Sequence, residues 1–260
     1  MRSAPARLLA LTVLVAGCRS LPVATPLPEG DARPDACLAA LVAAGAARES
    51  LRGVARVALS GPAGESRSKQ ILVVARPARL RVEVQGLLGQ LVAVLVSDGA
   101  RFALFRAGDG TVEEGEIRPA LLYEVAGLPL RPEEAVDALL GVPALREPTR
   151  RGPAAALSNG FVRVDLLDAA GGPTRRLECD AEAQLRRLEV RAPDGSLAWQ
   201  ASYDDHRPVG GTSFPHEIEL DFPADEARAK VTFQWLELNP ELPPDIFALD
   251  FAGSGPGERG

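Results

Sequence analysis

The stretch LRVEVQGLLGQLVAVLVSDGARFALF, residues 80–105, decides the fold of this chain. Its first segment alternates apolar residues with charged or polar ones, the period of a β-strand with one buried and one solvated face. The turn at 85–90 leads into the apolar run at 91–96, and a second turn at 97–99 leads into a segment around Phe102. The stretch therefore predicts three consecutive antiparallel strands.

Two short helical segments follow these strands. Each begins with a proline, Pro119 or Pro132, at the position where a helix needs no backbone N–H. Gly127 and Gly141 stand at their ends, and acidic residues occupy the first turn of the second segment. Amphipathic helices over an apolar sheet indicate either an ordinary core or a lined cavity.

Several short motifs follow one another through this region. They are Pro77, Leu80-Arg81, Leu88-Gly89, Ser97-Asp98-Gly99, Gly127-Leu128-Pro129-Leu130 and Leu139-Leu140-Gly141-Val142-Pro143. Their order resembles that of the outer-membrane lipoprotein receptor LolB and related LolB-like lipoproteins, most densely over Val54 to Pro143. The ending Leu238 to Leu249 also resembles a closing segment of LolA/LolB-like proteins, in which a proline-rich bend carries an aromatic residue back onto the barrel.

The resemblance and the strand pattern together imply a mainly β (α+β) fold. We expect a half-open antiparallel β-barrel of about eleven strands, with an N-terminal helix and a short helical lid over an apolar cavity. The expected domain covers residues 35–251, and residues 252–260 are expected to be a flexible tail.

Residues 1–17 are typical of a bacterial lipoprotein signal peptide. Two arginines precede a short apolar run at 8–15, and small residues stand immediately before Cys18. We expect Cys18 to be acylated and to anchor the protein, because the apolar run is shorter than the roughly 20 residues of a spanning helix. Arg19 follows where an aspartate would retain a lipoprotein in the inner membrane, so we expect the periplasmic face of the outer membrane.

Residues 18–34 are expected to form a flexible tether, because they contain four prolines and no apolar period. The whole chain has 29 basic and 35 acidic residues, and two of the basic ones lie in the leader, which leaves a net charge of −8. This balance argues against a nucleic-acid partner and against a general basic surface for anionic membranes.

Asp35 is expected to cap a helix from about Ala36 to Leu51 with an apolar face that includes Leu41 and Val42. Cys37 in this helix and Cys179 form an even pair in an oxidising compartment. They form either a disulfide that pins the helix to a strand or two separate buried thiols, and their spacing does not choose between these alternatives.

The remaining chain predicts a meander of strands joined by short turns. A basic loop is expected at Arg146 to Pro153. The further strands are expected at Arg52 to Leu59, Ser68 to Ala75, Thr111 to Glu116, Phe161 to Leu167, Thr174 to Cys179, Gln184 to Arg191, Leu197 to Tyr203, Ser213 to Phe222 and Arg228 to Leu236.

No motif in the sequence indicates catalysis, a cofactor or a metal site. His206 lies among carboxylates, a position expected to be a solvated turn rather than a metal site, and His216 is expected on the inward face of its strand. We therefore expect a protein that is not an enzyme. The resemblance to LolB-like lipoproteins implies that its partners are lipoprotein acyl chains or other lipid, with a periplasmic lipoprotein carrier as a further candidate.

The residues expected to line the cavity and lid are large and apolar. They are Leu80, Val82, Val84, Leu95, Phe102, Leu104, Leu121, Leu122, Val136, Leu139, Phe214, Ile218, Phe233 and Trp235. By the resemblance, Leu88 is expected to protrude and help deliver cargo into the membrane. Composition alone favours a closed core, and only the LolB-like order of motifs favours a cavity. A closed core would suit a structural or partner-binding envelope lipoprotein. A further alternative is a sensor of similar fold that binds mislocalised lipoproteins without transferring them.

Overall fold

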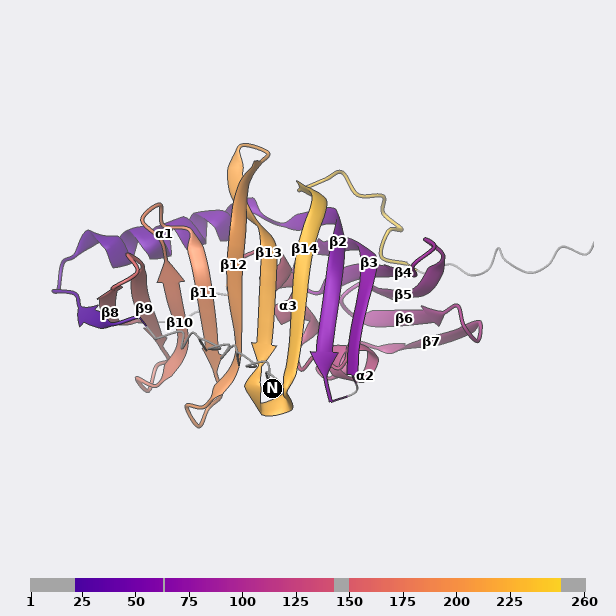
Figure 1. Cartoon of the computed structure of the whole chain (residues 1–260), viewed down its shortest axis with the longest axis horizontal. Helices are drawn as coiled ribbons and strands as arrows, with labels where there is room; N and C mark the ends of the chain where they lie inside the picture. Colours follow the sequence, from indigo (N-terminus) through magenta and orange to yellow (C-terminus); the bar gives the residue numbers. More distant parts are fainter. Residues whose placement is uncertain (1–21, 63, 143–149, 249–260) are drawn as a thin grey trace, which may run out of the picture.

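A single antiparallel sheet of fourteen strands dominates the computed structural model, which describes residues 22–62, 64–142 and 150–248 (Figure 1). Its strand order is β1-β8-β9-β10-β11-β12-β13-β14-β2-β3-β4-β5-β6-β7. Two meanders, β2 to β7 and β8 to β14, are thus joined where β14 pairs with β2. Because β1 and β7 are separate edges, the sheet does not close into a barrel.

The first meander and the strand that precedes it have these bounds: β1 (Ala24–Pro26), β2 (Ser50–Gly61), β3 (Gly64–Ala75), β4 (Arg79–Gln85), β5 (Leu91–Ser97), β6 (Arg101–Arg106) and β7 (Thr111–Glu116). The second consists of β8 (Arg150–Leu157), β9 (Val162–Leu167), β10 (Pro173–Cys179), β11 (Leu185–Arg191), β12 (Leu197–Val209), β13 (Thr212–Phe222) and β14 (Ala227–Leu238). The helices are α1 (Ala32–Ala47), α2 (Leu121–Ala126), α3 (Pro132–Leu139) and the 3-10 turn η1 (Pro223–Asp225).

The mainly β architecture with an N-terminal helix is confirmed, and the sheet has fourteen strands rather than about eleven. Two of them were not predicted. β8 replaces the described part of the expected basic loop, and β1 pairs with it inside the expected tether. The edge position explains the miss, because β1 is only three residues long and has no buried side chain.

The first helix lies four residues closer to the N-terminus than predicted. Asp31 caps it, since its carboxylate accepts a hydrogen bond from the backbone N–H of Arg33 at 3.0 Å. The helix ends at Ala47, because Ser50 and Leu51 already belong to β2, where Leu51 is fully buried. No helix in the described ranges has the length and hydropathy to cross a membrane.

All three helices cover one face of the sheet, here called the inner face. Alternate residues of nearly every strand point into a single apolar cluster on this face, which α1 covers at one end and α2 and α3 cover at the other (Figure 1). On the outer face, the C-terminal segment packs onto β3, where Phe247 is buried against Val73 and Ala75. This packing is the aromatic return that the proline-rich ending predicted.

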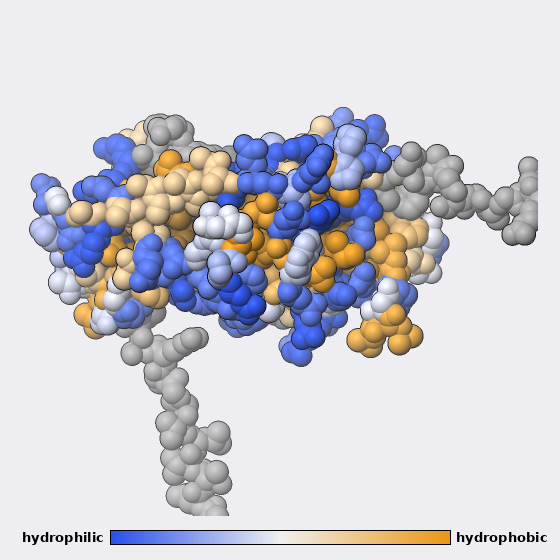
Figure 2. Space-filling model, turned by 90° about the horizontal axis from the view of Figure 1, so that it is seen from above, coloured by the Kyte–Doolittle hydropathy of each residue, from blue (hydrophilic) through white to orange (hydrophobic). Residues whose placement is uncertain are grey.

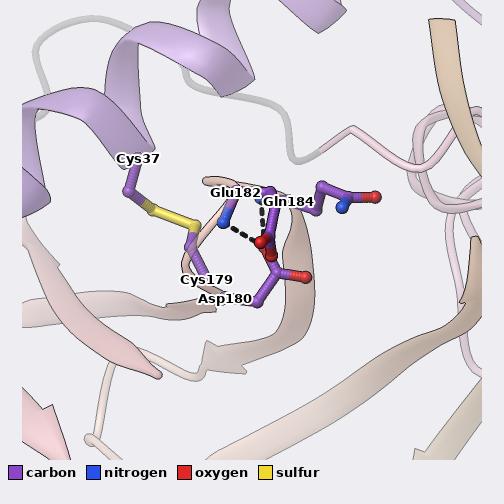
Figure 3. The surroundings of a disulfide bond; sticks show 5 residues. All are labelled: Cys37, Cys179, Asp180, Glu182 and Gln184. Carbon is purple, nitrogen blue, oxygen red and sulfur yellow. Dashed lines mark hydrogen bonds between the residues drawn. A yellow bond between two sulfur atoms is a disulfide. The ribbon is translucent and has the colours of Figure 1, made fainter. Parts of the chain in front are cut away.

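Cys37 and Cys179 form a disulfide, so this alternative is the correct one (Figure 3). Their Cα atoms are 6.0 Å apart, and the bond links the first third of α1 to the last residue of β10. The turn after Cys179 is held by the Asp180 carboxylate, which accepts from the backbone N–H groups of Glu182 at 3.2 Å and Gln184 at 2.8 Å. One end of the helical cover is therefore attached covalently.

Candidate functional site

Most of the residues predicted to line a cavity lie together on the inner face. Ten of the fourteen are buried in its apolar cluster: Leu80, Leu95, Phe102, Leu104, Leu121, Leu122, Val136, Phe214, Ile218 and Phe233. Val82 and Leu139 are half-buried against this cluster, and Val84 is half-buried at the end of β4. Strand and helix periodicity thus located one continuous apolar wall.

Trp235 is the exception, and its predicted inward orientation is wrong. The pairing of β14 with β2 shifts register between Phe233 and Trp235, so a β-bulge turns the following side chains over. Trp235 is 50% exposed on the outer face, with the Arg52 guanidinium 5.8 Å from its ring centre, and Leu236 takes the buried position. Strict alternation cannot reveal a bulge of this kind.

Side chains of the segment that follows β7 pack against this wall. Leu121 of α2 and Val136 of α3 are fully buried against it, as are Leu140 and Val142 just after α3. Two surface clefts, of about 560 and 680 Å³, are lined by other residues than those predicted for the cavity. Residues 117–142, here called the lid, therefore occupy the place where a ligand was expected.

The lid consists of two helices of six and eight residues. Gly127 ends α2 with a left-handed backbone at φ 67°, and the Glu134 carboxylate of α3 accepts from the Arg131 backbone N–H at 3.1 Å. Isolated helices of fewer than about 12 residues are marginal in water, so these two depend on packing for their stability. The lid is therefore stable only while its apolar side stays covered.

Arg48 fixes the C-terminal end of the lid. Its guanidinium donates to the carbonyl oxygens of Leu140 at 3.1 Å and Gly141 at 3.3 Å, and to that of Ser213 in β13 at 2.7 Å. The same guanidinium lies 5.1 Å from the ring centre of Phe214. Burial lowers the pKa of Arg48, since the surroundings disfavour its charge. One side chain thus joins α1, the lid and the sheet.

A second contact lies beside it. Arg76, at the corner between β3 and β4, forms an ion pair with Asp137 of α3 (Nε to Oδ1, 3.1 Å) and donates to the Gly45 carbonyl of α1 at 2.8 Å. The Tyr203 hydroxyl is fully buried without a hydrogen-bond partner in the described residues, and burial together with Asp137 raises its pKa. Arg48, Arg76, Asp137 and Tyr203 therefore form a polar cluster near the C-terminal end of α3.

Sequence reasoning missed this polar cluster. Arg48 and Arg76 each stand next to an apolar strand, and an arginine in such a place was the available signal. Their partners are mostly backbone carbonyls on distant segments, and such partners leave no pattern in the sequence.

The turn between β4 and β5 projects two leucines into solvent. Leu87 and Leu88 are 101% and 94% exposed, so Leu88 protrudes as the resemblance implied. Gly89 takes φ 81°, and the Gly86 N–H donates to the Gln90 carbonyl at 2.9 Å, which closes the turn. Two fully exposed leucines have an unfavourable contact with water that a membrane or an apolar partner would remove.

The two histidines lie on the second meander. His216 is buried on the inner face, as predicted. His206 belongs to β12 rather than to a solvated turn, with its Nδ1 3.3 Å from a guanidinium nitrogen of Arg186. Burial and the Arg186 charge lower the pKa of His206. No group of three or more potential metal ligands occurs within the described ranges.

Comparison with known proteins gives the fold. No family model and no curated protein matches the sequence. Among solved structures, a LolA superfamily protein from Nitrosomonas europaea aligns at TM-score 0.52 and 12% identity, over 83% of this chain and 98% of that one. A DUF1329 family protein from Desulfovibrio piger aligns at TM-score 0.50 and 8% identity, over 83% and 95%.

The protein has a LolA/LolB-like fold, in agreement with the resemblance seen in the motifs. At these identities the likeness establishes the fold alone. What the fold does in this chain has to be argued from its own residues.

Proposed function

We propose that this protein is a lipid-anchored envelope lipoprotein that binds the acyl chains of lipoproteins or other lipids against its inner face. In this role it acts as a receptor or carrier in lipoprotein localisation. The observation that supports the proposal most is the lid. It consists of two short helices that lie over a continuous apolar wall and are held there by packing and polar contacts, without a disulfide in the described residues. An acyl chain would displace the lid side chains and take their place against the wall.

Displacement is plausible on energetic grounds. Side chains such as Leu121 and Val136 contribute about 1.5–3 kcal/mol each when buried, and an acyl chain recovers about 0.8 kcal/mol per buried CH₂. A chain of a dozen or more carbons can therefore compensate for the lost lid packing. Transfer then needs no catalytic group, only a lid that moves and an affinity below that of the acceptor.

The anchor and the exposed turn complete the proposal. Acylation of Cys18, which lies outside the described residues, would hold the protein at the periplasmic face of the outer membrane. Leu88 would enter the acceptor bilayer and help to deliver the cargo. A periplasmic lipoprotein carrier would be the donor.

The test is binding of a fluorescent long-chain fatty acid to the chain that begins at Arg19. We expect near-stoichiometric binding, which Leu95→Ala weakens. Val96→Ala is the matched control, since Val96 is the next residue of β5 and is also buried, but on the outer face. Absence of binding, or equal weakening by both variants, would contradict the proposal.

A second candidate function is favoured by the filled inner face. A closed core suits a structural or partner-binding envelope lipoprotein that neither takes up nor transfers lipid. Under this alternative, pull-down from solubilised membranes recovers a stable protein partner and no lipid. Depletion of the protein leaves other lipoproteins correctly located under this alternative and strands them in the inner membrane under the first.

A further inference from the structure

The outer face carries a groove that the acyl-chain proposal does not use. Its volume is about 680 Å³, and it runs across β14, β2 and β3 to the turn after β4. Four basic side chains line it, and no carboxylate does: Arg56, Arg67, Lys69 and Lys230. In a protein with a net excess of acidic residues, this is a local reversal of charge.

Three of these cations are available to a ligand. Arg56, Arg67 and Lys69 are exposed and form no ion pair with any residue of the described ranges. Lys230 is different, because it contacts Glu217 at 2.5 Å and Glu219 at 2.7 Å. The unpaired charge is therefore concentrated on β2 and β3.

Strand register places this charge beside the exposed leucines. Lys69 pairs with Gln85, the last residue of β4, so continuing the register by two residues along each chain places Leu87 beside Arg67. Leu87 itself lines the groove. A cationic recess thus lies next to a fully exposed apolar tip.

Trp235 adds a third feature to the same face. The β-bulge turns it outward, and its partner Val54 lies two residues from Arg56 along β2, on the same face of the sheet. Half-exposed tryptophan is favoured at membrane–water interfaces, where its ring contacts the acyl boundary and its N–H reaches water. Figure 2 shows hydrophobic residues at the molecular surface in the half of the molecule that carries β4 to β7.

We infer that this groove is a binding site for the headgroups of anionic phospholipids, which orients the protein on the acceptor bilayer with Leu87 and Leu88 inserted. The occupant follows from charge complementarity and from the apolar tip beside it. A phosphate on a lipid satisfies both features, whereas a soluble anion satisfies only the first. The inference rests on the proposed function, because the lipid anchor keeps the protein at a membrane.

Fluorescence quenching of the full-length chain tests the inference. The reporter chain carries Leu88→Trp and Trp235→Phe, which leaves the buried Trp199 as a constant background. It is reconstituted into vesicles of phosphatidylcholine with brominated acyl chains, either alone or mixed with phosphatidylglycerol. We expect strong quenching of the tryptophan at position 88 only when phosphatidylglycerol is present.

Arg67→Gln with Lys69→Gln, added to the reporter chain, removes two of the unpaired cations. Each basic residue near an anionic surface favours the docked state about five-fold, so we expect the loss of two to lower the docked-to-undocked ratio by about 25-fold. Arg33→Gln with Arg207→Gln is the control, because it changes the net charge equally at two exposed arginines away from the groove. High salt should abolish the same quenching.

Equal quenching with and without phosphatidylglycerol, or an equal loss in both double variants, would overturn the inference. The fatty-acid titration keeps the two proposals apart. Acyl binding without phosphatidylglycerol-dependent quenching contradicts only the headgroup site, and quenching without acyl binding contradicts only the proposed function.

Discussion

The two ends of the inner face are covered in different ways. Over the second meander, α1 is a helix of sixteen residues joined to β10 by the disulfide. Over the first meander, the lid has two helices of six and eight residues that no disulfide in the described chain fixes. The apolar wall runs without a break beneath both covers.

This difference indicates which cover can move. A disulfide that closes a long loop restricts opening even when the packing loosens, whereas the lid depends on side-chain burial and the contacts of Arg48 and Arg76. Under the proposed function, ligand exchange would therefore take place under α2 and α3, and α1 would belong to the fixed part of the fold.

The largest effect is expected at the fixed end. Cys37→Ser with Cys179→Ser removes a link between residues 142 positions apart and should lower the free energy of unfolding by about 3–5 kcal/mol. Urea unfolding followed by circular dichroism measures the loss. A loss below about 1 kcal/mol would mean that α1 is held by packing alone, which would remove the contrast between the two ends.

A smaller effect is expected at the lid. Arg48→Met leaves three carbonyl oxygens without their donor and should cost about 1–3 kcal/mol. Amide exchange should accelerate over residues 132–142 and stay unchanged in β9 and β10. The control is Arg52→Met on β2, a half-buried arginine whose ion pair with Glu237 should contribute about 0–1 kcal/mol.

At the exposed turn we expect a change in function with almost none in stability. Leu88→Glu should alter the free energy of unfolding by less than about 0.5 kcal/mol, because the side chain is already in water. It should impair delivery to membranes more than acyl binding. Val42→Glu makes the same change at a 58%-exposed position on α1, and delivery should survive it.

The smallest effect is a pH dependence at the fixed end. Burial lowers the pKa of His206 in the folded protein, so the unfolded chain binds a proton more readily. Stability should therefore fall as the pH drops below the unfolded value of about 6.5 toward the folded one. His206→Gln should flatten urea midpoints between pH 7.5 and 5.5, and an unchanged slope would assign the dependence to other groups.

The sequence was informative wherever periodicity decided the structure. The alternation at 80–105, the proline that begins α3 and the glycines that end α2 and follow α3 are as predicted, whereas α2 begins at Leu121, two residues after the predicted start at Pro119. It failed where long-range pairing decided, since β1 and β8 stabilise each other at an edge and their residues carry no strong period. The Trp235 bulge and the Arg48 contacts are likewise set by partners far along the chain.

The sequence predicted which residues form the candidate site, but it did not predict whether lid side chains or a ligand cover them. The pattern identified the wall residues, and the lid side chains that fill it were themselves among those predicted as lining. Either Leu121 and Val136 or a ligand can pack on the wall. The outcome depends on a balance of packing energies, which residue spacing does not encode.

Hydrogen exchange in the presence of a long-chain fatty acid distinguishes a movable lid from a fixed α1. Saturating ligand should increase amide exchange across α2 and α3 while α1 and β10 keep their protection. Bound ligand with unchanged exchange in the lid, or equal loosening of α1 and the lid, would contradict the assignment of a fixed and a movable cover.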